Sequence, residues 1–336
     1  MPARILLGPQ SPASNLRRAA DAIRAEGPAV VITAGWRDSE GEIDDLREQL
    51  GRPLEDLNIY QRAEVVFAGE PALRELQRER QDRLRKLQEL YRLRLRPTLL
   101  AARKLMRAEA DPDLLRVEQR AAIAQVRALD RHHLRRIQSI HKEFNQRRSR
   151  LDLSRATVER DAVHEQIASA GLVLIAGGHV AVLLNRMRLF QLAGEIAKKP
   201  LIAWSAGAMA LSERVVLFHD HAPQGRRDAE LLDTGLGIVR QRILLPHGRT
   251  RLDWKNTRRM ALRGAEVTGV DFSAVALDYA RSRATPGVDY MQADYLADEL
   301  PGGFDIATLI YYDFCALAPG DRARLLGRIH DLSSLE

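Results

Sequence analysis

The chain has 336 residues, a formal net charge of +7 and one cysteine, Cys315. This length is sufficient for two domains with sizeable hydrophobic cores. A lone cysteine excludes an internal disulfide framework, and we expect a cytoplasmic protein because structural disulfides form in oxidising compartments. The apolar start is too short for a signal peptide, and no run approaches the roughly 18 apolar residues of a membrane span, so we expect no membrane contact.

Short apolar runs alternate with helical patterns over the first 60 residues. Strands are predicted at 4–8, 29–34 and 57–60, and helices from Ser11 or Ser14 to about Ala25 and over 42–50. Gly51 is placed to end the second helix, because glycine adopts the left-handed backbone that closes helices. Alternating strands and helices predict an α/β fold with a doubly wound parallel sheet.

Residues 71–150 differ in composition from the rest of the chain. They contain no glycine and carry 19 Arg and 3 Lys against 6 Glu and 4 Asp, so the positive charge is concentrated there. Apolar residues recur at helical spacing, among them Leu73, Leu76, Leu84, Leu87, Leu90, Ile123, Val126, Leu129, Ile137, Ile140 and Phe144. Pro97 is predicted to interrupt the first helix, and Asp111 to cap the second. The pattern predicts an antiparallel, coiled-coil-like helical hairpin inserted into the α/β domain.

Two partners fit a basic hairpin of this kind. The apolar stripe favours packing on another subunit, so we expect a homo-oligomer formed through the hairpin. The arginines would alternatively contact nucleic acid. We do not favour nucleic acid, because Tyr91 and Phe144 are the only aromatic residues of the segment and stacking on bases needs aromatic side chains.

A serine stands in a tight turn between a predicted strand and a predicted helix. The apolar run 200–202 leads into 203–208, Ala-Trp-Ser-Ala-Gly-Ala, which leads into another apolar segment. A strand, a serine among small residues and a helix form the pattern of a nucleophile elbow, in which Ser205 would project from the sheet. The plain alternative is a strand-to-helix turn that contains a serine by chance.

Two further strand ends carry groups that such a serine would need. Residues 171–176 form a predicted strand that ends in Gly177-Gly178, whose backbone can approach a ligand closely and offer N–H donors. Residues 242–247 form another that ends at His247, which could act as the base for a serine on a neighbouring strand. Each signal alone also fits an ordinary strand end.

Together, Gly-Gly, Trp-Ser-Ala-Gly-Ala and Pro-His resemble the dipeptidase E and cyanophycinase family over residues 1–70 and 151–255. That family consists of serine hydrolases with a type 1 glutamine amidotransferase-like fold. The resemblance implies that Ser205 is the nucleophile, that His247 is the general base and that the N–H groups of Gly178 and Ala206 form the oxyanion hole. It implies Asp220 as the acid that orients His247, although a polar turn explains Asp220 nearly as well. His179 replaces the polar residue that usually follows the two glycines.

The last 80 residues change character again. Strands that end near acids are predicted at 265–273 and 288–294, and a third strand at 304–311. This arrangement resembles the middle of a class I S-adenosylmethionine-dependent methyltransferase. The resemblance implies that Asp271 binds the ribose hydroxyls, that Asp294 contacts the adenine, and that residues 313–317 lie near the substrate.

The methyltransferase resemblance is incomplete. These enzymes need a glycine-rich turn about 20 residues before the ribose acid, and residues 249–263 contain no glycine. We therefore predict a partial Rossmann-like unit that binds S-adenosylmethionine weakly. The alternative is that its strands complete a sheet and leave both acids on the surface.

The predicted organisation has three parts. A hydrolase domain comprises 1–70 and 151–257, the basic hairpin comprises 71–150, and the methyltransferase-like unit comprises 258–336. The leading hypothesis is a serine hydrolase of small peptides or related amides that needs no cofactor and no metal. The alternatives are a methyltransferase and a non-catalytic scaffold that binds through the hairpin.

Overall fold

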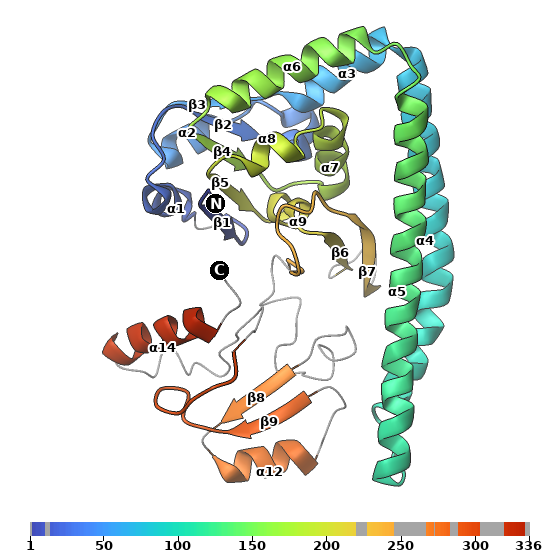
Figure 1. Ribbon diagram of the computed structural model, residues 1–336, viewed down its shortest axis with the longest axis vertical. Coiled ribbons are helices and arrows are strands. Elements are labelled where there is room, and N and C mark those ends of the chain that lie inside the picture. Colours follow the sequence, from blue (N-terminus) through green and yellow to red (C-terminus); the bar gives the residue numbers. More distant parts are fainter. Residues whose placement is uncertain are drawn as a thin grey trace. The chain divides into compact units, whose positions relative to one another are not determined.

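The computed structural model describes residues 2–10, 14–219, 227–244, 267–271, 273–282, 288–302 and 319–332. The chain divides into two compact units, the first made of residues 1–89 and 133–248 and the second of residues 90–132 and 249–336 (Figure 1). Each unit is described by itself below.

A five-stranded sheet forms the centre of the first unit. Its strands are β1 (Arg4–Leu7), β2 (Ala29–Ile32), β3 (Leu54–Asp56), β4 (Leu172–Ile175) and β5 (Leu201–Trp204). They lie in the order β1-β5-β4-β2-β3, and every neighbouring pair is parallel. The predicted doubly wound parallel sheet is therefore confirmed. All carboxyl ends of the strands meet at one edge, where ligands bind in open α/β sheets.

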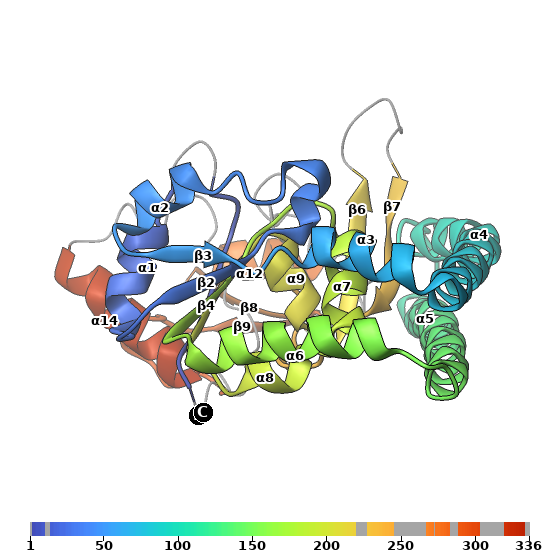
Figure 2. The ribbon, with the colours of Figure 1, turned by 90° about the horizontal axis from the view of Figure 1, so that it is seen from above.

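Helices cover both faces of this sheet, as Figure 2 shows for the first unit. They are α1 (Leu16–Ile23), α2 (Asp44–Leu50), α3 (Ile59–Gly69), α6 (Ser154–Ser169), α7 (Val180–Leu189), α8 (Ala193–Ala197) and α9 (Ala206–Leu211). Successive strand residues point to opposite faces: Val31 packs in the core under α1 and α2, whereas Val30 and Ile32 pack in the core under the other helices. Burial on both faces explains why the strands read as unbroken apolar runs.

The segment 57–60 was predicted as a strand, and that prediction is wrong. The strand there is β3, and Ile59 already begins helix α3. A distant residue decides this outcome: the carboxylate of Glu40 accepts hydrogen bonds from the N–H groups of Tyr60 (2.8 Å) and Gln61 (2.8 Å). These are first-turn donors that a helix cannot satisfy internally, so the tertiary cap overrides the short apolar pattern.

The basic segment forms a pair of long helices, α4 (Pro71–Leu105) and α5 (Pro112–Arg148). The prediction that Pro97 interrupts the first helix is wrong, because α4 continues through it. An internal proline costs roughly 3 kcal/mol, and the long buried stripe outweighs that cost. The hydroxyl of Thr98 also donates to the carbonyl of Arg94 (2.7 Å), which gives a carbonyl near the proline a partner.

The two helices are antiparallel along their whole length. In the first unit, ion pairs join Arg83 to Glu143 (2.7 Å) and Arg147 to Glu79 (2.7 Å). The core of that unit also contains Leu73, Leu76 and Phe144, so the base of the pair is part of the sheet domain. In the second unit, the Tyr91 hydroxyl donates to Asp130 (2.6 Å). The predicted helical hairpin is thus confirmed, whereas the predicted domain boundaries stay predictions.

Three smaller elements complete the described structure. Strands β6 (Arg214–His219) and β7 (Arg227–Thr234) form an antiparallel hairpin in the first unit. In the second unit, β8 (Val267–Asp271) and β9 (Val288–Gln292) pair in parallel, joined through helix α12 (Ala274–Ser282), and helix α14 (Pro319–Leu332) follows. None of the described helices combines the length and apolar character that crossing a membrane requires.

Candidate active site

Ser205 lies at the carboxyl end of β5 in a backbone conformation that few residues adopt. Its φ is 51° and its ψ is −120°, and it is the residue from which α9 begins. A positive φ is unfavourable for any residue with a Cβ atom, and such strain persists only where the surroundings impose it. The sharp turn that the sequence predicted at this serine is therefore present in the backbone.

Glycines around Ser205 allow the turn to lie against β4. A Cβ atom on Gly207 would stand 2.3 Å from the carbonyl oxygen of Ile175 and 2.7 Å from that of Ala176. A Cβ atom on Gly177 would stand 3.0 Å from the Cβ of Ser205. Only glycine fits these two positions without displacing neighbouring atoms, so the first turn of α9 and the end of β4 approach closely.

The next residue, Gly178, forms part of a second tight approach. Its φ is +106°, and a Cβ atom there would lie 2.5 Å from the carbonyl oxygen of Gly35, which follows β2. Ala206 is the first residue of α9, so its N–H has no acceptor within that helix. Gly178 and Ala206 therefore lie at the ends of neighbouring strands, as the prediction requires; their role as an oxyanion hole stays a prediction.

Two basic side chains occupy the same edge of the sheet. His179 donates its backbone N–H to Gly35 (2.8 Å), and its Nδ1 accepts the N–H of Val182 (3.3 Å) at the start of α7. Burial and the positive charge of Arg37 lower the pKa of His179, which favours the neutral ring with its proton on Nε2. Arg37 has φ 60° and ψ −115°, a second strained residue, in the 3-10 helix η1 (Ala34–Ser39) after β2.

Two further residues predicted for this site, His247 and Asp220, lie outside the described residues. The helix that follows β2 packs on one face of the sheet and the helix that follows β4 packs on the other. The segments after β2 and β4 meet at the carboxyl ends of the strands, the usual location of ligands in this architecture.

The two acids predicted to contact S-adenosylmethionine, Asp271 and Asp294, lie in the second unit. Asp271 ends β8, and one of its carboxylate oxygens accepts the N–H of Ser273 (2.8 Å). Asp294 follows the parallel neighbour β9, and one oxygen accepts the N–H of Leu296 (2.9 Å). The two carboxylates thus lie at or just after the ends of adjacent strands, and their contact with a ribose and an adenine stays a prediction. Residues 249–263 lie outside the described residues. In the described ranges, no group of three or more His, Cys, Asp or Glu could hold a metal ion.

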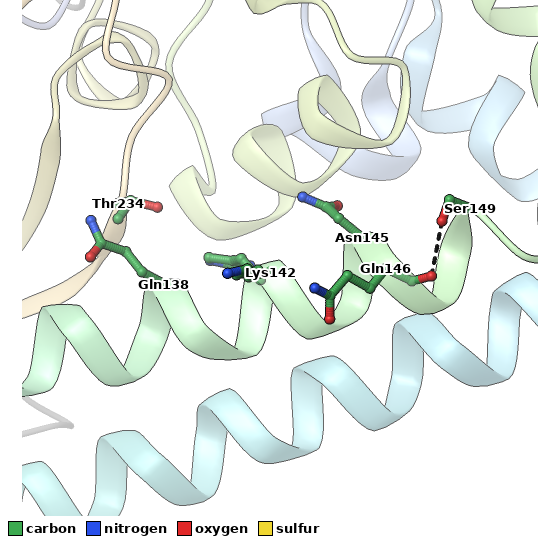
Figure 3. A pocket seen from close by; sticks show the side chains of 7 residues that line it. Gln138, Lys142, Asn145, Gln146, Ser149 and Thr234 are labelled. Atoms are coloured by element: carbon green, nitrogen blue, oxygen red, sulfur yellow. Dashed lines mark hydrogen bonds between the residues drawn. The ribbon is translucent and has the colours of Figure 1, made fainter.

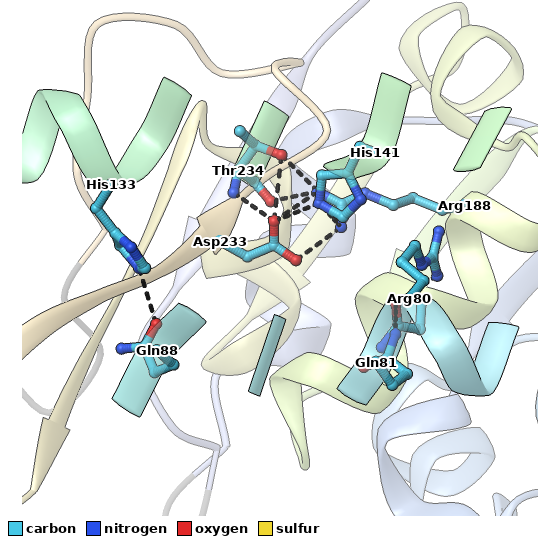
Figure 4. Close-up of polar contacts among 9 residues, drawn as sticks. Arg80, Gln81, Gln88, His133, His141, Arg188, Asp233 and Thr234 are labelled. Atoms are coloured by element: carbon cyan, nitrogen blue, oxygen red, sulfur yellow. Dashed lines mark hydrogen bonds and ion pairs between the residues drawn. The ribbon is translucent and has the colours of Figure 1, made fainter. Parts of the chain in front are cut away.

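A buried cluster of polar residues was not found by sequence analysis (Figure 4). The His141 Nε2 lies 2.7 Å from the Asp233 carboxylate, and both side chains are more than four-fifths buried. The Arg188 guanidinium donates to Asp233 (2.8 Å) and to the carbonyl and hydroxyl of Thr234 (2.5 and 2.7 Å). The three charged residues come from α5, β7 and α7, so no local pattern in the sequence brings them together.

Burial and charge act in opposite directions on the titration of this cluster. Burial alone would raise the pKa of Asp233, but the hydrogen bond from His141 and the charge of Arg188 hold it well below its usual range. Burial lowers the pKa of His141, although Asp233 opposes the shift. Asp233 is therefore an ionised carboxylate that neutralises a buried guanidinium.

This cluster lies at the far ends of α9, which begins after Ser205, and of α7, which begins after His179. Arg188 is in the last turn of α7. The residues after Thr234 return to the end of α9, where the N–H of Leu236 bonds to Ala210 (2.8 Å) and that of Ile238 to Leu211 (2.9 Å). The cluster therefore connects the base of the long helical pair to both helices of the candidate site.

An open hollow of about 670 Å³ adjoins the cluster (Figure 3). It is lined by Gln138, His141, Lys142, Asn145, Gln146, Ser149 and Thr234. Five of these residues lie on α5, Ser149 follows that helix directly, and none comes from the strand ends around Ser205. The hollow is therefore separate from the candidate active site.

Glu40, which caps α3, gives the first unit a specific pH dependence. Burial raises its pKa to about 7, although the backbone hydrogen bonds oppose the shift. Because this pKa is raised, folded Glu40 keeps a proton at a pH at which the unfolded chain has released it. The stability that comes from binding this proton is lost as the pH rises toward 7 and above. We expect the unfolding free energy of the wild type, relative to Glu40→Gln, to fall by on the order of 2 kcal/mol between pH 5 and 8.

Urea unfolding at pH 5, 6, 7 and 8 measures this difference. Glu42→Gln is the matched control, because Glu42 is exposed and close in sequence. The difference in unfolding free energy between Glu42→Gln and the wild type should not change with pH. A pH-independent difference for Glu40→Gln would show that the buried carboxylate does not titrate in this range.

Two family descriptions match the chain. Residues 123–270 match Peptidase family S51, and residues 255–334 match a Methyltransferase domain. No curated protein matches the chain significantly. The first match includes β4, β5, Gly178 and Ser205, and the second includes Asp271 and Asp294. Both resemblances drawn from the sequence are therefore confirmed, whereas the roles of the individual residues stay predictions.

Proposed function

We propose that this chain, which carries a peptidase family S51 domain at residues 123–270, is a serine hydrolase of small peptides or related amides. The observation that carries the proposal is the strained backbone of Ser205 between β5 and α9, pressed against the diglycine after β4. A serine held this way projects its hydroxyl from the sheet toward N–H donors on two strand ends.

The proposed reaction begins with attack of the Ser205 Oγ on the carbonyl carbon of the substrate. His247 takes the proton of the hydroxyl, and the N–H groups of Gly178 and Ala206 stabilise the oxyanion that forms. The C–N bond then breaks, and the amine leaves with the proton from His247. Water, deprotonated by His247, hydrolyses the acyl-enzyme and restores Ser205. Asp220 orients the imidazole throughout.

Two residues at the same edge would select the substrate. The neutral ring of His179 presents an Nε2–H donor beside Gly178, and Arg37 adds a positive charge. Both are donors, so we expect the substrate to carry acceptor oxygen atoms near the bond that is cleaved.

Labelling with a fluorophosphonate probe tests this function without knowledge of the substrate. We expect the full-length protein to be labelled at Ser205, Ser205→Ala to show no labelling, and His247→Ala to react at least about 10³-fold more slowly. Ser169→Ala is the matched control, because Ser169 is an exposed serine on α6. Circular dichroism must show that each variant is folded. Absence of labelling in the folded wild type, or labelling that persists in Ser205→Ala, would refute the proposal.

A second candidate function, methyl transfer, rests on the domain match over residues 255–334 and on the two acids at the ends of β8 and β9. Asp271 and Asp294 would hold the nucleoside part of S-adenosylmethionine, the cofactor that supplies the methyl group. Residues 249–263 offer no glycine for the methionine part. We expect calorimetry to show binding weaker than about 10 µM. Micromolar binding that Asp271→Ala weakens would instead favour a methyltransferase.

A further inference from the structure

One buried carboxylate closes the segment that follows β2. Asp56, the last residue of β3, is 6% exposed, and its Oδ2 accepts the hydroxyl of Thr33 and the backbone N–H of Gly41 (3.1 Å). Thr33 directly follows β2, and Gly41 lies just beyond the 3-10 helix η1. A single oxygen atom therefore joins the two ends of residues 33–41. We call Asp56 with these two donors the Asp56 clamp.

The two bonds of the clamp are not local. An aspartate in this position commonly forms a turn with the residue two places on, and the other oxygen of Asp56 does so by accepting the N–H of Asn58 (3.0 Å). The bonds to Thr33 and Gly41 instead span 23 and 15 positions. Burial raises the pKa of Asp56, although its hydrogen bonds oppose the shift. Burying this charge is thus unfavourable, and the bonds of the clamp offset part of the cost.

Between the two clamped ends the backbone is strained. Arg37 has φ 60° and ψ −115°, close to the φ 51° and ψ −120° of Ser205. This conformation is unfavourable for a residue with a Cβ atom, and it persists only where surrounding contacts impose it. The side chain of Arg37 is exposed, so packing of that side chain does not impose it. The clamp instead fixes the two ends of the turn that contains Arg37.

The clamped segment touches the diglycine after β4 through Gly35. The carbonyl oxygen of Gly35 accepts the N–H of His179 (2.8 Å), and a Cβ atom on Gly35 would stand 2.6 Å from the carbonyl oxygen of Gly177. A Cβ atom on Gly178 would in turn stand 2.5 Å from the oxygen of Gly35. The two backbones are therefore in direct contact, and a shift of Gly35 must move the diglycine and His179.

The diglycine is thus held from two sides. Ser205 lies against Gly177 at the end of β5, whereas Gly35 lies against Gly178 at the end of β2. Gly178 is proposed to supply an N–H donor to the oxyanion, and such donors are effective only when they are already in the correct position. That position depends on the contact with Gly35 as well as on the turn at Ser205.

We propose that Asp56 is a positioning residue for the candidate active site: through Thr33 and Gly41 it holds Gly35, and Gly35 holds the backbone of Gly178 and His179. Strands β2 and β4 separate β3 from the serine strand β5, so the effect reaches the site through the backbone. The expected effect on reaction rate rests on the proposed hydrolase, whereas the expected effect on the backbone does not.

Substitutions of Thr33 test the clamp in the full-length protein. Valine has the shape of threonine without the hydroxyl, whereas serine keeps the hydroxyl. We expect Thr33→Val and Asp56→Ala to lower the maximal rate of fluorophosphonate labelling of Ser205 at least about tenfold, because a small displacement of catalytic groups slows a reaction strongly. Thr33→Ser should recover most of that rate. If Asp56→Ala does not fold, Thr33→Val decides the outcome.

A destabilising control separates positioning from a merely structural role. Val163 is fully buried on α6, which packs on α3 and α8, so Val163→Ala lowers stability by leaving a cavity in another part of the core. The folded Val163→Ala protein should be labelled at the wild-type maximal rate. A merely structural clamp would give the same result for Thr33→Val, with a lower melting temperature and an unchanged maximal rate.

Hydrogen exchange measures the effect on the backbone whether or not the protein is a hydrolase. The N–H of His179 is protected by its bond to Gly35. We expect peptides that contain His179 to exchange at least about tenfold faster in Thr33→Val than in the wild type, because loss of the clamp favours local opening. Peptides from α6 should keep the wild-type rate, and Thr33→Ser should behave like the wild type.

Three results would overturn the proposal. They are a wild-type maximal labelling rate in folded Thr33→Val, an equal slowing in Val163→Ala, and unchanged exchange at His179 in folded Thr33→Val. A wild type that is not labelled at all would refute the hydrolase. The exchange of His179 would then still decide whether Asp56 positions this backbone.

Discussion

Replacing Asp233 by alanine is expected to lower the unfolding free energy by about 3–5 kcal/mol, because it leaves the buried charge of Arg188 without a counter-ion. Urea unfolding at pH 7 measures the loss. Asp82→Ala is the matched control: Asp82 pairs with Arg85 on the exposed side of α4, and such pairs contribute less than about 1 kcal/mol. A loss below 1 kcal/mol for Asp233→Ala would show that the cluster does not stabilise the fold.

The same variant should change the acid sensitivity of the protein. The pKa of folded Asp233 lies below the usual range of an aspartate. The stability that the ionised carboxylate contributes is therefore present at neutral pH, and it is lost as the pH falls below the pKa of an ordinary aspartate. The difference in unfolding free energy between the wild type and Asp233→Ala should therefore become smaller as the pH is lowered. Adding Arg188→Met should recover part of the stability, because it removes the unpaired charge.

Replacing Gly207 by alanine is expected to slow the labelling of Ser205 by roughly 100-fold. The added Cβ would stand 2.3 Å from the carbonyl oxygen of Ile175, a main-chain atom of a central strand that cannot move without disturbing the sheet. Helix α9 must shift instead, and it carries Ser205 away from Gly177 and Gly178. Overpacking of this kind also costs about 1–3 kcal/mol of stability.

Gly194→Ala is the matched control for this substitution. Gly194 is also helical, in α8, and a Cβ atom there meets nothing within 4 Å among the described residues. We expect its labelling rate to stay within about twofold of the wild type, with a small gain in stability because alanine favours helices. Equal labelling rates for the two variants would show that the close approach at Gly207 does not position the serine.

Much of the sheet could be predicted from the sequence, because each strand is specified by residues that are close together in the chain. The runs that contain Val31, Leu174 and Ile202 are continuous and apolar, and each forms a strand buried on both faces. The turn at Ser205 was likewise predictable from small residues between a strand and a helix. Such features are determined by residues a few positions apart.

The features that sequence analysis missed depend on contacts between distant residues. The start of α3 is determined by Glu40, about 20 positions earlier, and α4 passes Pro97 because its other face is buried along α5. His141, Arg188 and Asp233 each resemble surface residues in their own segments. They become a buried network only when α5, α7 and β7 pack together.

The strand order also determines when the sheet can assemble during folding. Among the described strands, β1 pairs only with β5, so the backbone of Arg4 gains a paired neighbour only after the distant Leu201 has been placed. Until β4 is available, β2 and β3 form a two-stranded pair, which is marginally stable alone. The contacts between α4 and α5 near their connecting turn, such as that between Tyr91 and Asp130, are far more local. Short-range contacts form faster than long-range parallel strand pairing. We therefore expect the pair of helices α4 and α5 to fold before β4 and β5 pair in the sheet and position Ser205.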